Sequence, residues 1–79
     1  MSNLEKYNNA FCEAFEISED VLQGLKYQGV EAWDSVGHMN LMAMLEDAFD
    51  IMMDTDDIID LSSYEIGKEI LKKYDVEID

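Results

Sequence analysis

Apolar residues recur at helical spacing in three separate segments of this 79-residue chain. In residues 4–15 they are three or four positions apart, which places their side chains on one face of a helix. Residues 35–49 and the region from about residue 63 to residue 74 repeat the pattern, and no segment alternates as a strand would. The stripes are Leu4, Tyr7, Phe11 and Phe15; Leu41, Leu45, Ala48 and Phe49, with Met42 and Met52; and Ile66, Ile70, Leu71 and Tyr74. We therefore expect an all-α fold.

Two other segments complete the expected architecture. Residues 16–34 have no periodicity and contain Gly24 and Gly29, so they predict a long ordered loop that can include a turn of helix. Residues 54–61 predict a short helix with Ile58 and Leu61 facing inward. A chain of this length forms one small domain, here residues 1–79. The prediction is a small four-helix bundle with three longer helices, one short helix and a long first loop.

Polar residues that can cap a helix stand at the start of each longer segment. The candidates are Ser2 or Asn3, Asp34 or Ser35, and Ser62 or Ser63. Asp34 and Ser35 cannot both fill one capping role, so one of them should be free for other work. Because free N–H groups face the start of a helix, a phosphate is well tolerated beside Ser35.

Acidic residues dominate the charge of the chain. It has 19 Asp and Glu against 5 Lys and Arg, and a formal net charge of −14. Such a balance excludes nucleic acid and anionic membrane surfaces as partners, since both need basic residues. From Tyr27 to Gly67 there is no Lys or Arg, but there are ten acids. A solvated face is one interpretation, but a field of one sign favours a docking surface for basic partners. We also expect raised pKa values among the acids crowded near the short helix.

Several observations concern the cellular environment. No apolar run approaches the length that spans a bilayer, and the first residues lack a basic stretch followed by an apolar one. The single cysteine, Cys12, cannot form an internal disulfide and is expected to be a packing or surface residue. These features predict a cytoplasmic protein, and we expect it to be a monomer.

The residues for catalysis or specific metal binding are scarce. Ser35 and His38 lie one helical turn apart, but no glycine-rich elbow surrounds the serine, so no enzyme is expected. Residues 54–65 have acids at several positions of a calcium-binding loop. However, Ile58 and Ile59 stand where that loop needs an oxygen ligand and a glycine. A small calcium-binding protein therefore stays only as an alternative.

One set of residues resembles a known family. Asp34-Ser35-Val36 is followed by Leu41, Leu45 and, at residues 46–51, Glu-Asp-Ala-Phe-Asp-Ile. This pattern is similar to that of the acyl carrier proteins, in which Asp-Ser-Leu precedes an E-E-x-F-x-I stretch, and the similarity covers essentially the whole chain. It implies that a phosphopantetheinyl transferase attaches 4′-phosphopantetheine, taken from coenzyme A, to Ser35. Acyl groups would then be carried as thioesters on that arm, with Asp34 helping to position the metal and substrate of the transferase.

The resemblance also implies a surface for partner enzymes and a place for the cargo. The expected partners are an acyl ligase, synthase or acyltransferase with a basic docking patch. Cargo would enter between helices near Met53 and Ile58. The residues expected to bind partners are Val36, Asn40, Ala43, Glu46, Asp47, Met53 and Asp57.

Departures from the family pattern leave other interpretations open. Val36 replaces the usual Leu, and Trp33 precedes the motif, which is more similar to stand-alone carriers of specialised pathways. Gly37 is expected to weaken the first turn of its helix by about 1 kcal/mol relative to Ala. His38 either binds near the phosphate or is a partly solvated helix residue. The alternatives are an aminoacyl carrier of the D-alanyl type, an unmodified interaction module, and the calcium-binding protein.

Overall fold

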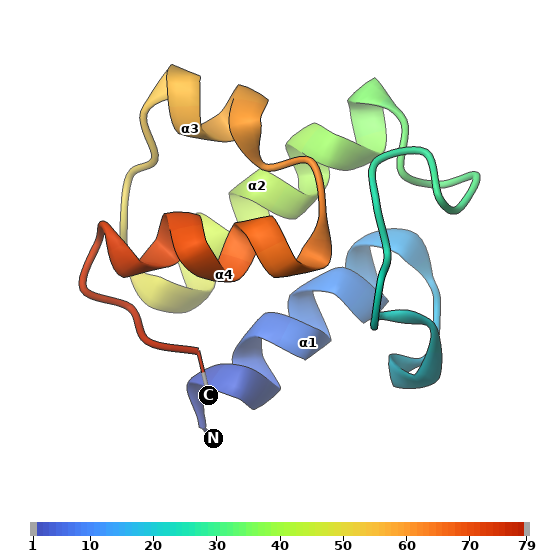
Figure 1. Ribbon diagram of the computed structural model, residues 1–79, viewed down its shortest axis with the longest axis horizontal. Helices are drawn as coiled ribbons and strands as arrows, with labels where there is room; N and C mark the ends of the chain where they lie inside the picture. The colour runs from blue at the N-terminus through green and yellow to red at the C-terminus, as the bar shows by residue number, and fades with distance from the viewer. Residues whose placement is uncertain (1, 79) are drawn as a thin grey trace.

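The structure, a computed structural model, describes residues 2–78 and confirms the all-α prediction. Within that range it has four α-helices, one short 3-10 helix and no β-strand (Figure 1). The helices are α1 (Asn3–Phe15), α2 (Ser35–Phe49), α3 (Thr55–Asp60) and α4 (Tyr64–Lys72), and the 3-10 helix is η1 (Glu19–Val21). The last helix ends two residues before the predicted Tyr74, while α1 and α2 end where the periodicity ends.

The three longer helices begin at side-chain caps. Ser2 and Glu5 form a reciprocal capping box at α1, and the Ser63 hydroxyl accepts from the Ile66 amide (3.0 Å) at α4. Both α1 and α2 end at a residue in the left-handed conformation, Glu16 (φ 54°) and Asp50 (φ 53°). The helix limits are therefore set by contacts within a few residues of each end.

An aromatic cluster joins α1, the long loop and α4. Phe11 makes edge contacts with Tyr7, Trp33 and Tyr64, and Phe15 stacks on Trp33. Tyr7 and Trp33 are fully buried. Each aromatic side chain buries a large apolar area, so this cluster provides much of the stability of a small core.

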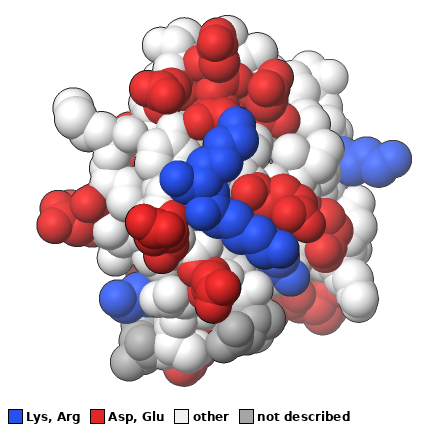
Figure 2. Space-filling view, turned by 60° about the vertical axis from the view of Figure 1, so that its left-hand side comes forward, with Lys and Arg blue, Asp and Glu red and all other residues white. Residues whose placement is uncertain are grey.

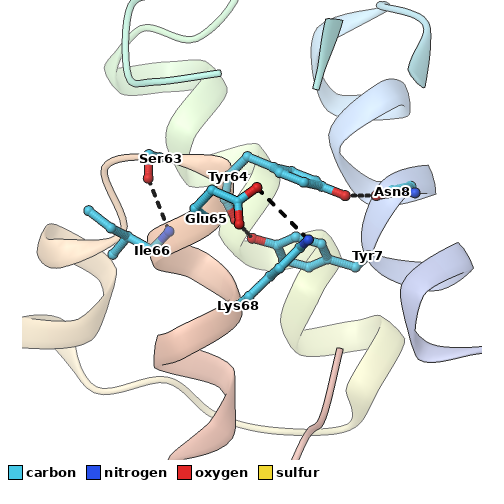
Figure 3. A network of polar contacts seen from close by, with 7 residues as sticks. All are labelled: Tyr7, Asn8, Ser63, Tyr64, Glu65, Ile66 and Lys68. Carbon is cyan, nitrogen blue, oxygen red and sulfur yellow. Dashed lines mark hydrogen bonds and ion pairs between the residues drawn. The ribbon is translucent and has the colours of Figure 1, made fainter. Parts of the chain in front are cut away.

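Hydrogen bonds tie α1 to the start of α4 (Figure 3). The Tyr7 hydroxyl donates to the Tyr64 carbonyl (2.6 Å), and the Tyr64 hydroxyl donates to the Asn8 side chain. Burial raises the pKa of Tyr7 far above its ordinary value, so this phenol stays a donor. At the start of α1, the Asn3 side-chain amide donates to the Glu77 carbonyl (3.0 Å), which joins this helix to the C-terminal segment (Figure 1).

The predicted inner faces of two helices need correction. Met52 is 87% exposed and Ile66 is 42% exposed, although both were expected to face inward. Met52 follows the left-handed Asp50, which ends α2 and breaks the helical spacing. In α4 the predicted Ile70 and Leu71 are buried, and Tyr64 and Gly67 take the other inner positions. A Cβ atom on Gly67 would lie 2.1 Å from the Tyr7 hydroxyl, so α4 approaches α1 closely there.

Backbone hydrogen bonds order the long loop. The Tyr27 amide donates to the Ser62 carbonyl (2.8 Å), and the Tyr64 amide donates to the Leu25 carbonyl (2.9 Å). This antiparallel pairing fixes the loop to the junction of α3 and α4. Leu22, Leu25 and Trp33 are buried in the core, so the predicted long ordered loop is confirmed.

In residues 2–78, none of the helices has the length and apolar character needed to cross a membrane.

Candidate functional site

Ser35 is the first residue of α2, and its side chain is exposed. The preceding Asp34 is the N-cap, and its Oδ1 accepts from the Gly37 amide at 2.8 Å. The cap is therefore the aspartate. The Ser35 hydroxyl has no hydrogen-bond partner among residues 2–78 and faces solvent. The structure thus separates the two roles that the sequence left open.

Gly37 allows the long loop to pass close to the start of α2. It is buried, and a Cβ atom built on it would lie 1.9 Å from the Ala32 carbonyl oxygen and 3.3 Å from the Phe15 ring. The expectation that this glycine only weakens the helix is incomplete. Any larger side chain would push the Ala32 backbone, and with it Trp33, out of place.

His38 joins three parts of the chain. Its Nδ1 accepts from the Trp33 indole Nε1 at 3.0 Å, and its Nε2 lies 2.7 Å from the carbonyl oxygen of Ile58 in α3. Nδ1 is an acceptor and Nε2 faces an acceptor, so the network assigns a neutral ring with the proton on Nε2. His38 is half-buried. Neither interpretation of His38 from the sequence predicted these two hydrogen bonds. The signal was Trp33, because a buried indole N–H needs a nearby acceptor.

A cavity of about 340 Å³ opens beside Ser35. It lies between the first turns of α2, helix α3 and the segment that leads into α4. The lining is mostly apolar and contains no Asp, Glu or Lys. Its residues are Tyr27, Ser35, His38, Met39, Ile58, Ile59, Leu61 and Ser62. Leu61 is fully buried and Ile58 half-buried, which confirms their predicted inward positions.

Two exposed apolar side chains, Met39 and Ile59, line this cavity, and a third, Val36, follows Ser35 in the chain. Val36 is 70% exposed, Met39 is 55% exposed and Ile59 is 70% exposed. Val36 and Met39 lie one helical turn apart on α2, while Ile59 lies across the cavity on α3. Grouped apolar side chains on a small surface are typical of contact sites for other molecules.

Most of the residues expected on the docking face are exposed along α2. Val36, Asn40, Ala43 and Asp47 have exposed side chains. Glu46 differs, since it is half-buried and its carboxylate accepts from the Met53 amide at 2.8 Å. It therefore holds the segment between α2 and α3, and only part of its side chain is accessible.

The prediction that Met53 and Asp57 lie on the docking surface is wrong, because both residues are buried. Met53 is 7% exposed and Asp57 is 6% exposed. The Asp57 carboxylate accepts from the Lys73 ammonium at 2.6 Å and from the Tyr74 hydroxyl. These hydrogen bonds lower the pKa of Asp57, so the expected upward shift is wrong at this residue. The cause is the packing of α3 against the end of α4, which offers Asp57 a cation.

Lysines gather on the side of the molecule that carries the end of α4. Figure 2 shows them crossing this face with acidic side chains on both sides. Lys72 pairs with Glu69 (3.4 Å) and Lys68 with Glu65 (4.0 Å). Helices α2 and α3 contain no Lys or Arg, so acids such as Asp47 have no basic residue on their own helix.

The geometry also bears on catalysis and metal binding. Both ring nitrogens of His38 are engaged, by Trp33 and by the Ile58 carbonyl, so His38 is not placed to act as a base toward Ser35. In the part of the chain that the structure describes, no three His, Cys, Asp or Glu side chains are grouped to hold a metal ion.

Comparisons of the chain with protein-family models, curated proteins and solved structures found no match.

Proposed function

We propose that this chain is an acyl carrier protein, in which Ser35 bears 4′-phosphopantetheine. The observation that carries the proposal is the exposed hydroxyl at the first residue of α2, left unpaired because Asp34 provides the cap. An attacking hydroxyl must reach the phosphorus atom of a donor held by another protein. Ser35 meets that need without disturbing the helix.

The start of α2 suits the product of this reaction. The Ser35 oxygen would form a bond to the phosphate of the pantetheine part of coenzyme A, the nucleotide part would leave, and the hydroxyl proton would pass to the transferase. The resulting phosphodiester would lie beside the first N–H groups of a 15-residue helix. Those groups and the helix dipole favour an anion there.

The surface around Ser35 supports docking of partner enzymes. Exposed Val36 and Met39 offer an apolar contact, while Asp47 and the other acids of α2 and α3 attract a basic patch. The partners would be a phosphopantetheinyl transferase and an acyl ligase, synthase or acyltransferase. The arrangement as a four-helix bundle, a monomeric state and a cytoplasmic location belong to the same proposal.

The cavity beside Ser35 favours an acyl cargo over an amino acid. Its lining has apolar side chains and no carboxylate that would pair with the ammonium group of an aminoacyl thioester. An apolar chain of modest length would be shielded from water there. The aminoacyl carrier thus stays the weaker candidate.

The test is incubation of the purified chain with coenzyme A and a broad-specificity phosphopantetheinyl transferase, followed by intact mass. We expect one phosphopantetheine group on the wild type and on Ser62→Ala, and none on Ser35→Ala. Ser62 is a fair control because it is exposed and lines the same cavity. Attachment that persists in Ser35→Ala would refute the assignment.

A further inference from the structure

Helix α3 depends on side chains from other elements. It has six residues, Thr55–Asp60, and a helix this short is not stable alone in water. The last four carbonyl groups of a helix lack partners within it, and the Ile58 carbonyl is one of these. His38 of α2 supplies that partner through Nε2 at 2.7 Å. It is the one hydrogen bond between α2 and α3 in residues 2–78.

The His38 ring is itself held in place from the other side. The Trp33 indole donates to Nδ1 at 3.0 Å, and the two rings are nearly parallel, with an interplanar angle of 13° and centroids 6.2 Å apart. Trp33 is fully buried, so its position is fixed by the core. A continuous chain of hydrogen bonds therefore runs from the core through His38 to the backbone of α3.

Other hydrogen bonds anchor the segment before α3 and the third residue of the helix, Asp57. The Met53 amide donates to Glu46, the Asp54 amide donates to the Tyr74 hydroxyl (2.9 Å), and Asp57 pairs with Lys73 and Tyr74. None of these contacts involves the cavity lining. The segment after α3 is anchored as well, because Leu61 is fully buried and the Ser62 carbonyl accepts from the Tyr27 amide (2.8 Å). His38 therefore holds the cavity side of α3 between two anchored ends.

We propose that His38 is a latch that holds α3 closed against α2 and so sets the width of the cavity beside Ser35. The cavity is lined from α2 by Ser35 and Met39 and from α3 by Ile58 and Ile59. When the His38–Ile58 hydrogen bond breaks, the cavity side of α3 loosens between its two anchored ends and the cavity widens. This inference does not depend on the modification of Ser35, since it concerns the unmodified chain.

The test uses amide hydrogen exchange measured residue by residue by NMR. His38→Phe keeps an aromatic ring but has no nitrogen for either contact. His38→Gln keeps a donor N–H at the same level of the side chain as Nε2, so it can still donate to the Ile58 carbonyl. Met39→Ala is the matched control, because Met39 lines the same cavity without a hydrogen bond to α3.

In His38→Phe, exchange at the Ile58 and Leu61 amides should rise about fivefold to tenfold relative to the amides of α1. His38→Gln should restore most of the protection, and Met39→Ala should leave it unchanged. A rise that is equal across all helices, or no rise at α3, would overturn the latch. So would a His38→Gln variant that exchanges as fast as His38→Phe.

A second measurement needs no variant. The ring nitrogens of His38 in the wild type, observed by ¹⁵N NMR at neutral pH, should show a neutral ring with the proton on Nε2. A proton on Nδ1, or a charged ring, would contradict the donor and acceptor roles on which the latch rests.

Discussion

Replacing Gly37 with alanine tests how closely the long loop approaches α2. The added Cβ atom would lie 1.9 Å from the Ala32 carbonyl oxygen, where real contacts essentially never fall under 3.0 Å. The Ala32 backbone must then move by about 1 Å. A carbonyl oxygen cannot rotate away as a flexible side chain does, and the next residue, Trp33, is fully buried in the aromatic cluster.

The magnitude follows from two opposing effects. Overpacking of a well-packed region destabilises by about 1–3 kcal/mol, and a backbone clash belongs at the upper end of that range. Alanine is the better helix former by about 1 kcal/mol, which offsets part of the loss. The net prediction is a decrease of about 2 kcal/mol in the free energy of unfolding, or about 10 °C in Tm for a domain of this size.

The assay is urea unfolding followed by circular dichroism, with Asn40→Ala as the control. Asn40 is exposed on the same helix, so its replacement changes helix propensity without a clash. We expect Asn40→Ala to be as stable as the wild type or about 0.5 kcal/mol more stable. A Gly37→Ala variant that matches or exceeds the wild type would refute the close approach of the loop.

Three further predictions follow from the same structure. Asp34→Ala should lose about 1 kcal/mol in urea unfolding, whereas Ser35→Ala should lose less than about 0.5 kcal/mol, because the cap is the aspartate; equal losses would contradict this division. Because the pKa of Asp57 is lower in the folded protein than its ordinary value of 3.8, its ionised form stabilises the fold at any pH above 3.8. This stability is lost as the pH falls through the folded-state pKa. The gap in unfolding free energy between wild type and Asp57→Asn should therefore be constant above about pH 5 and shrink in acid, and a gap that widens in acid would disprove the pairing. Asp47→Lys should weaken binding to the transferase and flatten its salt dependence, measured as association rate at two ionic strengths; an unchanged rate would indicate an apolar interface.

The helices and the position of Ser35 were predictable because their signals are local. Apolar spacing and capping residues lie within a few positions of each other, so the limits of α1 and α2 could be read directly from the sequence. The same reasoning failed at Met52, because the stripe was extended past Asp50 without knowing that this residue ends the helix in the left-handed conformation.

The rest of the site depends on contacts between segments distant in the chain. His38 meets Ile58 twenty residues later, and Asp57 meets Lys73 sixteen residues later. Helical periodicity carries no information on such pairs. Crowding in sequence predicted repulsion among the acids, but the fold places a lysine and a tyrosine hydroxyl against Asp57 and reverses the direction of its pKa shift.

We propose Ser35 as the attachment point of a phosphopantetheine arm. The most direct measurement is the fragment mass spectrum of the wild-type chain after incubation with coenzyme A and a phosphopantetheinyl transferase. Fragments that contain Ser35 should gain the mass of one phosphopantetheine group, while those that contain Ser2, Ser18, Ser62 or Ser63 without Ser35 should not. An unmodified chain, or a group located on any other residue, would show that Ser35 is not the attachment point.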